Sequence, residues 1–279
     1  MTETMLWTSL RRMRRNRGAM AGLVLLALFS LGAILAPYIA PYDPQAMHYD
    51  VRLLAPGLRF LMGTDEFGRD LFRAMLHGGR VSLLVGFISV SISGVLGTSL
   101  GLAAGYFPKL DGIVSRIVDI WLAFPTLLLA IAIVAVLGPG LRNAMIAVGI
   151  SATPSYIRLV RGVVLGARER EYVEAAQAVG ARDALILRRH ILPNVAAPII
   201  VLSTLQFGGA ILSAASLSFL GLGAQPPTPE WGALVSAGRG FIRQAWWLSL
   251  FPGGAIMLVV LALNLLGDGL RDALDPRLK

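Results

Sequence analysis

Few side chains in this sequence have the types and spacing that catalysis requires. The 279 residues include three histidines and no cysteine, so the chain can form neither disulfides nor thiolate metal sites. Asp65, Asp70 and His77 come closest to a metal-ligand set, but no second histidine or carboxylate is spaced to share a helical face with them. The sequence therefore predicts no metal site.

Two further kinds of chemistry are excluded in the same way. The only lysines, Lys109 and Lys279, do not follow a glycine, so the Gly-Lys-Ser/Thr of a phosphate-binding loop does not occur. The run Gly267–Gly269, with its central aspartate, resembles part of an intramembrane aspartyl protease, but the other apolar segments lack the second aspartate that such an enzyme needs. We predict no catalytic residues and no cofactor bound by this chain itself.

The composition predicts an integral membrane protein. With 56% hydrophobic and 15% charged residues, the chain is too apolar for a soluble domain. Five uncharged blocks reach the roughly 20 residues of a membrane span, at residues 18–42, 81–108, 120–141, 191–229 and 244–267. A sixth block, 143–157, becomes long enough if Arg158 and Arg161 reach the membrane surface from a longer helix. We expect an all-α fold with six transmembrane helices.

The distribution of basic residues predicts the orientation. With a cytoplasmic N-terminus, 17 of the 25 basic residues fall inside and 8 outside, as the positive-inside rule requires. Both termini and the loop at residues 169–194 are then cytoplasmic.

The chain divides at residue 80. Residues 1–80 hold an N-terminal amphipathic helix, the first span and an external loop, and residues 81–279 hold the other five spans. Leu6, Leu10 and Met13 fall at helical spacing among arginines, which is typical of a helix lying on the inner leaflet. The alternative is a basic segment that only precedes the first span.

Three polar or small-residue sets are candidates for other roles. The external loop contains a turn-rich motif that either contacts an external partner or caps the bundle: Gly63, Thr64, Asp65, Arg69 and Asp70. The second span has small residues at every fourth position, which permits close helix packing with a partner subunit or with this chain's own helices: Ser89, Ser93, Gly97, Gly101 and Gly105. The fifth span has polar residues that either line a path or bond to other helices: Gln206, Ser213 and Ser216.

The third and fourth spans contain prolines, and the spans lack charged residues near their centres. Pro125 and Pro154 lie inside the third and fourth spans, where each permits a kink. No span has a charged residue near its centre, so proton-coupled transport and voltage sensing lack their usual groups. Any energy for transport must come through a partner.

The polar loop at residues 169–194 is the most informative segment. Residues 169–179 favour a helix, Gly180 is a natural stop, residues 182–190 can form a second short helix, and Pro193 with Asn194 breaks it before the fifth span. Its apolar residues predict a docking side for a partner in the water phase: Ala175, Ala176, Val179, Leu185, Ile186 and Leu192.

This loop resembles the EAA loop of permease subunits in bacterial binding-protein-dependent ABC importers. The match comprises Glu174-Ala175-Ala176, Gly180 and Leu192-Pro193 at the family's spacing, with His190 where the family has isoleucine. Other segments resemble the C-type permease of dipeptide and oligopeptide importers, a group that includes nickel and glutathione systems: residues 63–70, 119–125, 189–194, 218–223 and 267–276. Together they cover nearly the whole chain.

The resemblance implies a type I importer permease core in the bacterial inner membrane. It implies a second homologous permease, two cytoplasmic ATPase subunits that bind ATP and Mg²⁺, and an external substrate-binding protein. The EAA loop would be the coupling helix, with the ATPase contact made by Glu174, Ala175, Ala176, Gly180, Leu192 and Pro193. The rival readings are a carrier or channel that works alone and a membrane scaffold without transport.

Overall fold

The computed structural model describes residues 13, 16–41, 43 and 46–274. These residues form helices joined by loops, which confirms the all-α prediction for this part of the chain. The amphipathic helix expected before Arg17 falls almost wholly outside the described residues.

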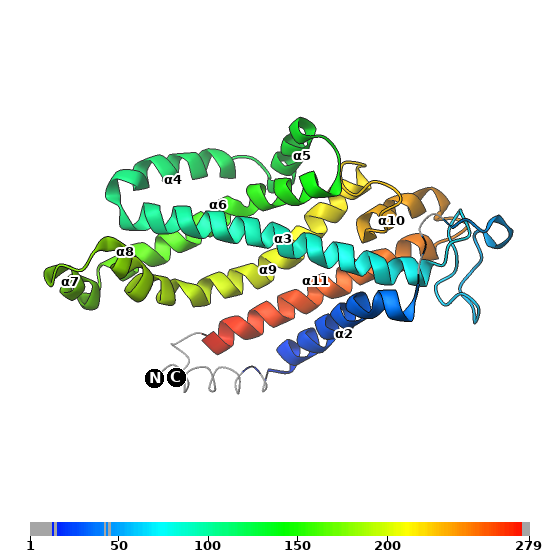
Figure 1. Cartoon of the computed structure of the whole chain (residues 1–279), viewed down its shortest axis with the longest axis horizontal. Helices are drawn as coiled ribbons and strands as arrows, with labels where there is room; N and C mark the ends of the chain where they lie inside the picture. The colour runs from blue at the N-terminus through cyan, green and yellow to red at the C-terminus, as the bar shows by residue number, and fades with distance from the viewer. Residues whose placement is uncertain (1–12, 14–15, 42, 44–45, 275–279) are drawn as a thin grey trace.

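The helices lie side by side in an elongated bundle (Figure 1). In chain order they are α2 (Arg17–Ile39), η1 (Tyr49–Val51), α3 (Leu71–Tyr106), α4 (Pro108–Leu122), α5 (Thr126–Leu137), α6 (Leu141–Arg168), α7 (Glu171–Ala178), α8 (Asp183–Ile186), η2 (Leu187–Ile191), α9 (Leu192–Phe219), α10 (Trp231–Gly238), η3 (Arg239–Phe241) and α11 (Trp247–Leu274). The start of α2 and the end of α11 lie at the end of the bundle where α7 projects, and the external loop and α10 lie at the opposite end (Figure 1).

The span count depends on the middle of the chain. Within the described residues, four segments are long and apolar enough to cross a membrane, namely α2, α3, Asp183–Phe219 and α11, and α4 with α5 makes a fifth if the bent pair is one span. Helix α6 has 28 residues, about 42 Å at 1.5 Å per residue, but it contains four arginines. Six spans therefore stay a prediction, with α6 as the sixth helix.

The third predicted span is not one kinked helix. Helices α4 and α5 meet at 93°, and Pro125 stands before α5 in an extended conformation with ψ of 131° instead of inside a helix. Proline has no N–H to continue the hydrogen bonds of a helix. The chain therefore turns between two separate helices at Pro125, whereas the prediction was a kink within one helix. Pro154, by contrast, lies inside the continuous helix α6.

The break expected at Pro193 and Asn194 is also wrong. The chain stays helical from Asp183 to Phe219, because the π-helical turn η2 absorbs the proline at the start of α9. The N–H of Leu192 donates to the carbonyl of Leu187, five residues back. The side-chain amide of Asn194 donates to the carbonyl of His190 at 2.6 Å, so a side chain supplies part of the hydrogen bonding in this turn.

Helices α3 and α6 approach closely because α3 has glycine at their contact. A Cβ at each of three glycines would lie 2.3 to 2.7 Å from a Cβ of α6: Tyr156 opposite Gly97, Val160 opposite Gly101 and Val164 opposite Gly105. Such distances are shorter than side chains allow, so only glycine fits there. The small-residue stripe therefore packs within this chain, which decides the question that the sequence left open.

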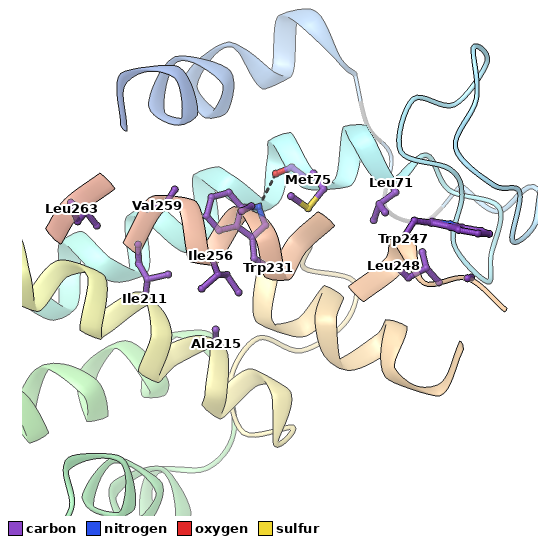
Figure 2. Close-up of a cluster of buried hydrophobic side chains, with 12 residues drawn as sticks. Leu71, Met75, Ile211, Ala215, Trp231, Trp247, Leu248, Ile256, Val259 and Leu263 are labelled. Atoms are coloured by element: carbon purple, nitrogen blue, oxygen red, sulfur yellow. Dashed lines mark hydrogen bonds between the residues drawn. The ribbon is translucent and has the colours of Figure 1, made fainter. Parts of the chain in front are cut away.

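A second cluster holds together the end of the bundle that contains α10. Trp231, at the start of α10, is buried among side chains of α3, α9 and α11, and its indole N–H donates to the carbonyl of Met75 at 3.0 Å (Figure 2). The adjacent Glu230 is 1% exposed. Its carboxylate accepts the N–H groups of Gly232 at 2.9 Å and Ala233 at 3.0 Å and the hydroxyl of Ser82 at 3.1 Å. Burial of this carboxylate is thus offset by three hydrogen bonds.

Replacing Gly101 by alanine is expected to destabilise this chain by about 1–3 kcal/mol, because the new methyl group would overlap Val160. The matched control is Gly162→Ala on α6, where a Cβ would meet nothing within 4 Å. Thermal unfolding of the two variants in detergent measures the difference. Equal midpoints for both variants would contradict the packing role of Gly101.

Candidate functional site

The loop at residues 169–194 has the predicted arrangement of helix, glycine and helix. Helix α7 ends at Ala178 with Val179 as its C-cap, and Gly180 takes φ +80°, a conformation that glycine adopts without strain. The N–H of Gly180 donates to the carbonyl of Gln177 and that of Ala181 to the carbonyl of Ala176, which closes the turn. The second helix is short, because α8 passes into the π-helical turn η2 after Ile186.

The loop is fixed to the bundle by a buried apolar cluster. Val173, Ile186 and Ile191 are each 0% exposed and pack with Val160 and Val164 of α6. Ile186 was expected on the docking side, but it points into the bundle. The burial of Ile186 attaches the segment formed by α7 and α8, which we call the lever, to the long helices α6 and α9.

A hydrogen bond adds a polar attachment to the same region. The hydroxyl of Tyr106, at the end of α3, donates to the carboxylate of Asp183 at the start of α8, with 2.7 Å between the oxygens. Helix α3 is thereby tied to the loop as well as to α6.

The outer side of the loop is open. Val179 is 83% exposed, Leu185 48% and Leu192 37%, and Glu174 and Ala175 are also exposed. Gly180 and Pro193 are exposed too, whereas Ala176 is half-buried and packs against the cluster beneath. The residues predicted to contact a partner thus mostly share an accessible surface, with Ala176 and Ile186 set back from it.

Three polar residues link α7 to the start of α9. The side-chain amide of Asn194 donates to the hydroxyl of Tyr172 at 3.2 Å. The ring of Tyr172 lies 6.3 Å from that of His190, centroid to centroid. His190 therefore occupies the family's isoleucine position as a half-buried ring beside Tyr172, and its packing is accommodated locally.

A second candidate site is a polar pocket in the middle of the bundle. Its volume is about 230 Å³, and it lies between α3, α5, α6 and α9. Ser89 and Ser93 of α3, Thr126 of α5, and Gln206 and Ser213 of α9 contribute its polar lining. Two of the three predicted path residues are thus brought together.

The hydrogen bonds separate two kinds of polar residue around this pocket. Ser216 is not among the lining residues, and its hydroxyl donates to the carbonyl of Leu212 within its own helix. The hydroxyl of Ser89 likewise donates to the carbonyl of Met145 at 3.1 Å. The described residues offer no hydrogen-bond partner to the side chains of Gln206, Ser213 and Thr126.

Sequence reasoning missed Thr126 in the pocket and Glu230 in the core. Thr126 is brought to the pocket by the turn at Pro125, which a kinked span would not have produced. The signal for Glu230 was present, since a glutamate before a tryptophan and a glycine can cap a helix, but its burial depends on Ser82, 148 residues away in sequence.

The external motif is largely occupied in folding its own loop. Thr64 is fully buried and bridges the carbonyl of Val51 and the N–H of Leu54. Asp65 accepts the N–H of Arg69 at 2.8 Å and pairs with its guanidinium at 2.6 Å. These bonds fit the bundle-capping alternative.

The remaining motif residues are also held by internal contacts. Asp70 caps α3 by accepting the N–H of Phe72 at 2.9 Å. Gly63 has φ +79° and lies against the ring of Trp247. Burial raises the pKa of the neighbouring Glu66 carboxyl, with a hydrogen bond from its backbone opposing the change. Contact of this motif with an external partner stays a prediction.

The described residues form a bundle of membrane-length helices with an exposed loop at one end and a pocket between α3, α5, α6 and α9, which is the architecture of a membrane transport subunit. Residues 94–279 match the family of binding-protein-dependent transport system inner membrane components, and residues 4–56 match the N-terminal transmembrane domain of oligopeptide transport permease C. The chain belongs to this family of ABC importer permeases, as the EAA resemblance indicated.

Named relatives and solved structures agree with this assignment. The chain is 51% identical over 271 residues to the di/tripeptide transport system permease protein DppC of Pseudomonas aeruginosa, covering 95% of this chain and 89% of that one. It is 49% identical to the glutathione transport system permease protein GsiD of Escherichia coli, with 96% and 89% covered. An inward-facing structure of the MetNI methionine ABC transporter shares the fold, with a TM-score of 0.59 at 21% identity over 72% of this chain and 96% of that one.

The pocket can be tested with single cysteines, because the chain has none of its own. A cysteine at position 213 should react with a water-soluble thiol reagent about tenfold faster than one at position 212, since apolar surroundings suppress the thiolate. Leu212 is the matched control, because it is 53% exposed on the outer face of the same helix. Labelling rates in the assembled complex in membranes measure the difference. Faster labelling at position 212 would contradict a water-accessible pocket at Ser213.

Proposed function

We propose that this chain is one of two homologous permeases that form the path for di- and oligopeptides in an ATP-driven importer. A substrate-binding protein delivers the peptide from outside, and two cytoplasmic subunits bind ATP and Mg²⁺ and dock on the loop of α7 and α8. The main observation that supports this proposal is that buried residues attach the loop to the helical bundle, while other residues of the loop are exposed. The relatives named as peptide permeases support the substrate class.

We infer the orientation from the same arrangement and from the distribution of charge. The start of α2, the end of α11 and the lever of α7 and α8 lie at one end of the bundle (Figure 1). The excess of basic residues supports the cytoplasm for that end. The external loop and α10 then face the periplasm, where a binding protein would dock.

The packing suggests how movement would pass from the ATPases to the path. When an ATPase displaces α7, the buried Val173, Ile186 and Ile191 move with it and push on α6 and α9. These two helices also border the polar pocket. Because α3 is packed closely against α6, such a push would move these helices together against the second permease, opening the path at one end of the bundle and closing it at the other.

Glutathione is the second candidate substrate, because one relative at 49% identity is named as a glutathione permease. Reconstitution with each candidate binding protein separates the two. ATP-dependent uptake of radiolabelled dipeptides into vesicles supports the peptide assignment. Flux through this chain alone, driven by an ion gradient and without an ATPase, would overturn the importer assignment altogether.

Charge reversal at Glu174 should uncouple ATP hydrolysis from uptake. Glu174 is exposed in the first turn of α7, and Glu174→Lys would leave any cationic partner group on an ATPase facing a like charge. We expect peptide uptake to fall about tenfold or more, with unchanged insertion of the permease into the membrane. Uptake and ATPase activity are measured together in vesicles that contain all subunits.

The matched control is Asp272→Lys, a charge reversal at an exposed position near the end of α11 and away from the loop. Gly180→Pro should resemble Glu174→Lys, because proline cannot adopt φ +80°. Normal uptake by both loop variants would refute the docking role.

A further inference from the structure

The central pocket has an unusual lining for a path that carries peptides. Its polar groups are hydroxyls and one carboxamide, and none of the lining residues carries a charge. A peptide in water carries a charged amino group and a charged carboxylate. A pocket built to hold those ends tightly would place ionised partners against them.

Three of the polar lining groups are left without an internal partner. Gln206 and Ser213 are seven residues apart on α9, which puts them two turns apart on one helical face. Only the small residues Gly209 and Ala210 line the pocket between them. Thr126, the first residue of α5, faces the same space.

Polar groups of a membrane subunit that have no partner within the chain take their hydrogen bonds from outside it. Within the hydrocarbon region a polar group without a hydrogen bond is costly. Nearby hydroxyls avoid that cost by bonding to their own helices, as Thr204 does to the carbonyl of Ile200 at 3.0 Å. Gln206, Ser213 and Thr126 instead remain open to whatever fills the pocket.

We propose that Gln206, with Ser213 and Thr126, forms a subsite that hydrogen-bonds the main-chain amide of the passing peptide. This proposal rests on the proposed function. A carboxamide offers both a carbonyl acceptor and N–H donors, as a peptide unit does. It therefore pairs with the part that all peptides share, whatever their side chains.

The absence of charge in this subsite has a consequence for selectivity. Neutral hydrogen bonds are about half as strong as those to ionised groups, and a path must bind weakly enough to release what enters it. An ionised side chain here would hold peptides of opposite charge and reject those of like charge. Gln206 thus keeps the path tolerant of acidic and basic side chains alike.

The test compares peptides of different charge in the complete importer reconstituted in vesicles. Uptake of Ala-Ala, Lys-Ala and Glu-Ala is measured for each variant and divided by the wild-type value for the same peptide. This division cancels the preference of the binding protein. The variants are Gln206→Glu, which keeps the shape and adds a charge, and Gln206→Leu, which removes the hydrogen-bonding amide.

With Gln206→Glu, relative uptake of Glu-Ala should fall about tenfold or more below that of Ala-Ala, because like charges would meet in the pocket. Relative uptake of Lys-Ala should not fall with it. With Gln206→Leu, uptake of all three peptides should fall by a similar factor. An equal loss of all three peptides with Gln206→Glu would overturn the proposal, because it indicates that position 206 packs against the second permease.

A matched pair of isosteric changes tests the hydroxyls. Thr126→Val removes an unpartnered hydroxyl from the pocket, whereas Thr204→Val removes one already bonded within its helix. We expect lower uptake of every peptide with Thr126→Val and near wild-type uptake with Thr204→Val. Equal uptake by the two variants would contradict the hydroxyl's role. Failure of the wild-type complex to import any peptide would refute the proposed function instead.

Discussion

The rest of the structure depends on the close approach of α3 and α6. Glycine on α3 at Gly97, Gly101 and Gly105 lets the backbones meet over three consecutive turns. Toward the end of the bundle that holds α10, the same two helices border the polar pocket through Ser89, Ser93 and Val148. Toward the end that holds α7, they reach the cluster that anchors the loop, through Tyr106, Val160 and Val164. A closely packed pair of helices thus joins the loop at residues 169–194 to the pocket.

Several features could be predicted from the sequence because they depend on local chemistry. Apolar blocks of span length, the glycine stop at Gly180 and the small-residue stripe all follow from composition and spacing, and the family motifs fix the class of protein. Whether the helix breaks or continues at each proline could not be predicted. Pro125 stands between two helices, Pro154 lies inside one, and Pro193 follows a π-helical turn. What distinguishes them is tertiary packing, which local sequence does not encode.

The candidate sites show the same limit. The docking side of the loop was predicted from its apolar residues, but Ile186 serves to attach the loop, since an apolar residue is equally suited to a core or an interface. Similarly, Gln206 and Ser213 line the pocket while Ser216 bonds back to its own helix. Three polar residues on one span look alike in sequence. Only the positions of neighbouring helices decide which of them remain unpaired.

Exposed apolar surface, which would suggest a docking site on a soluble protein, has a different meaning here. Ile113 and Ile120 on α4 are 61% and 62% exposed, and lipid accounts for such exposure in a membrane protein. Polar groups are therefore more informative. The carboxylate of Asp111 and the guanidinium of Arg161 form an ion pair, and this pair joins α4 to α6. In the pocket, the groups without partners are neutral, and at the loop the exposed residues include charged Glu174. In the function we propose, the charged surface of the loop would receive force in water, and the neutral groups of the pocket would form weak hydrogen bonds with the substrate within the membrane.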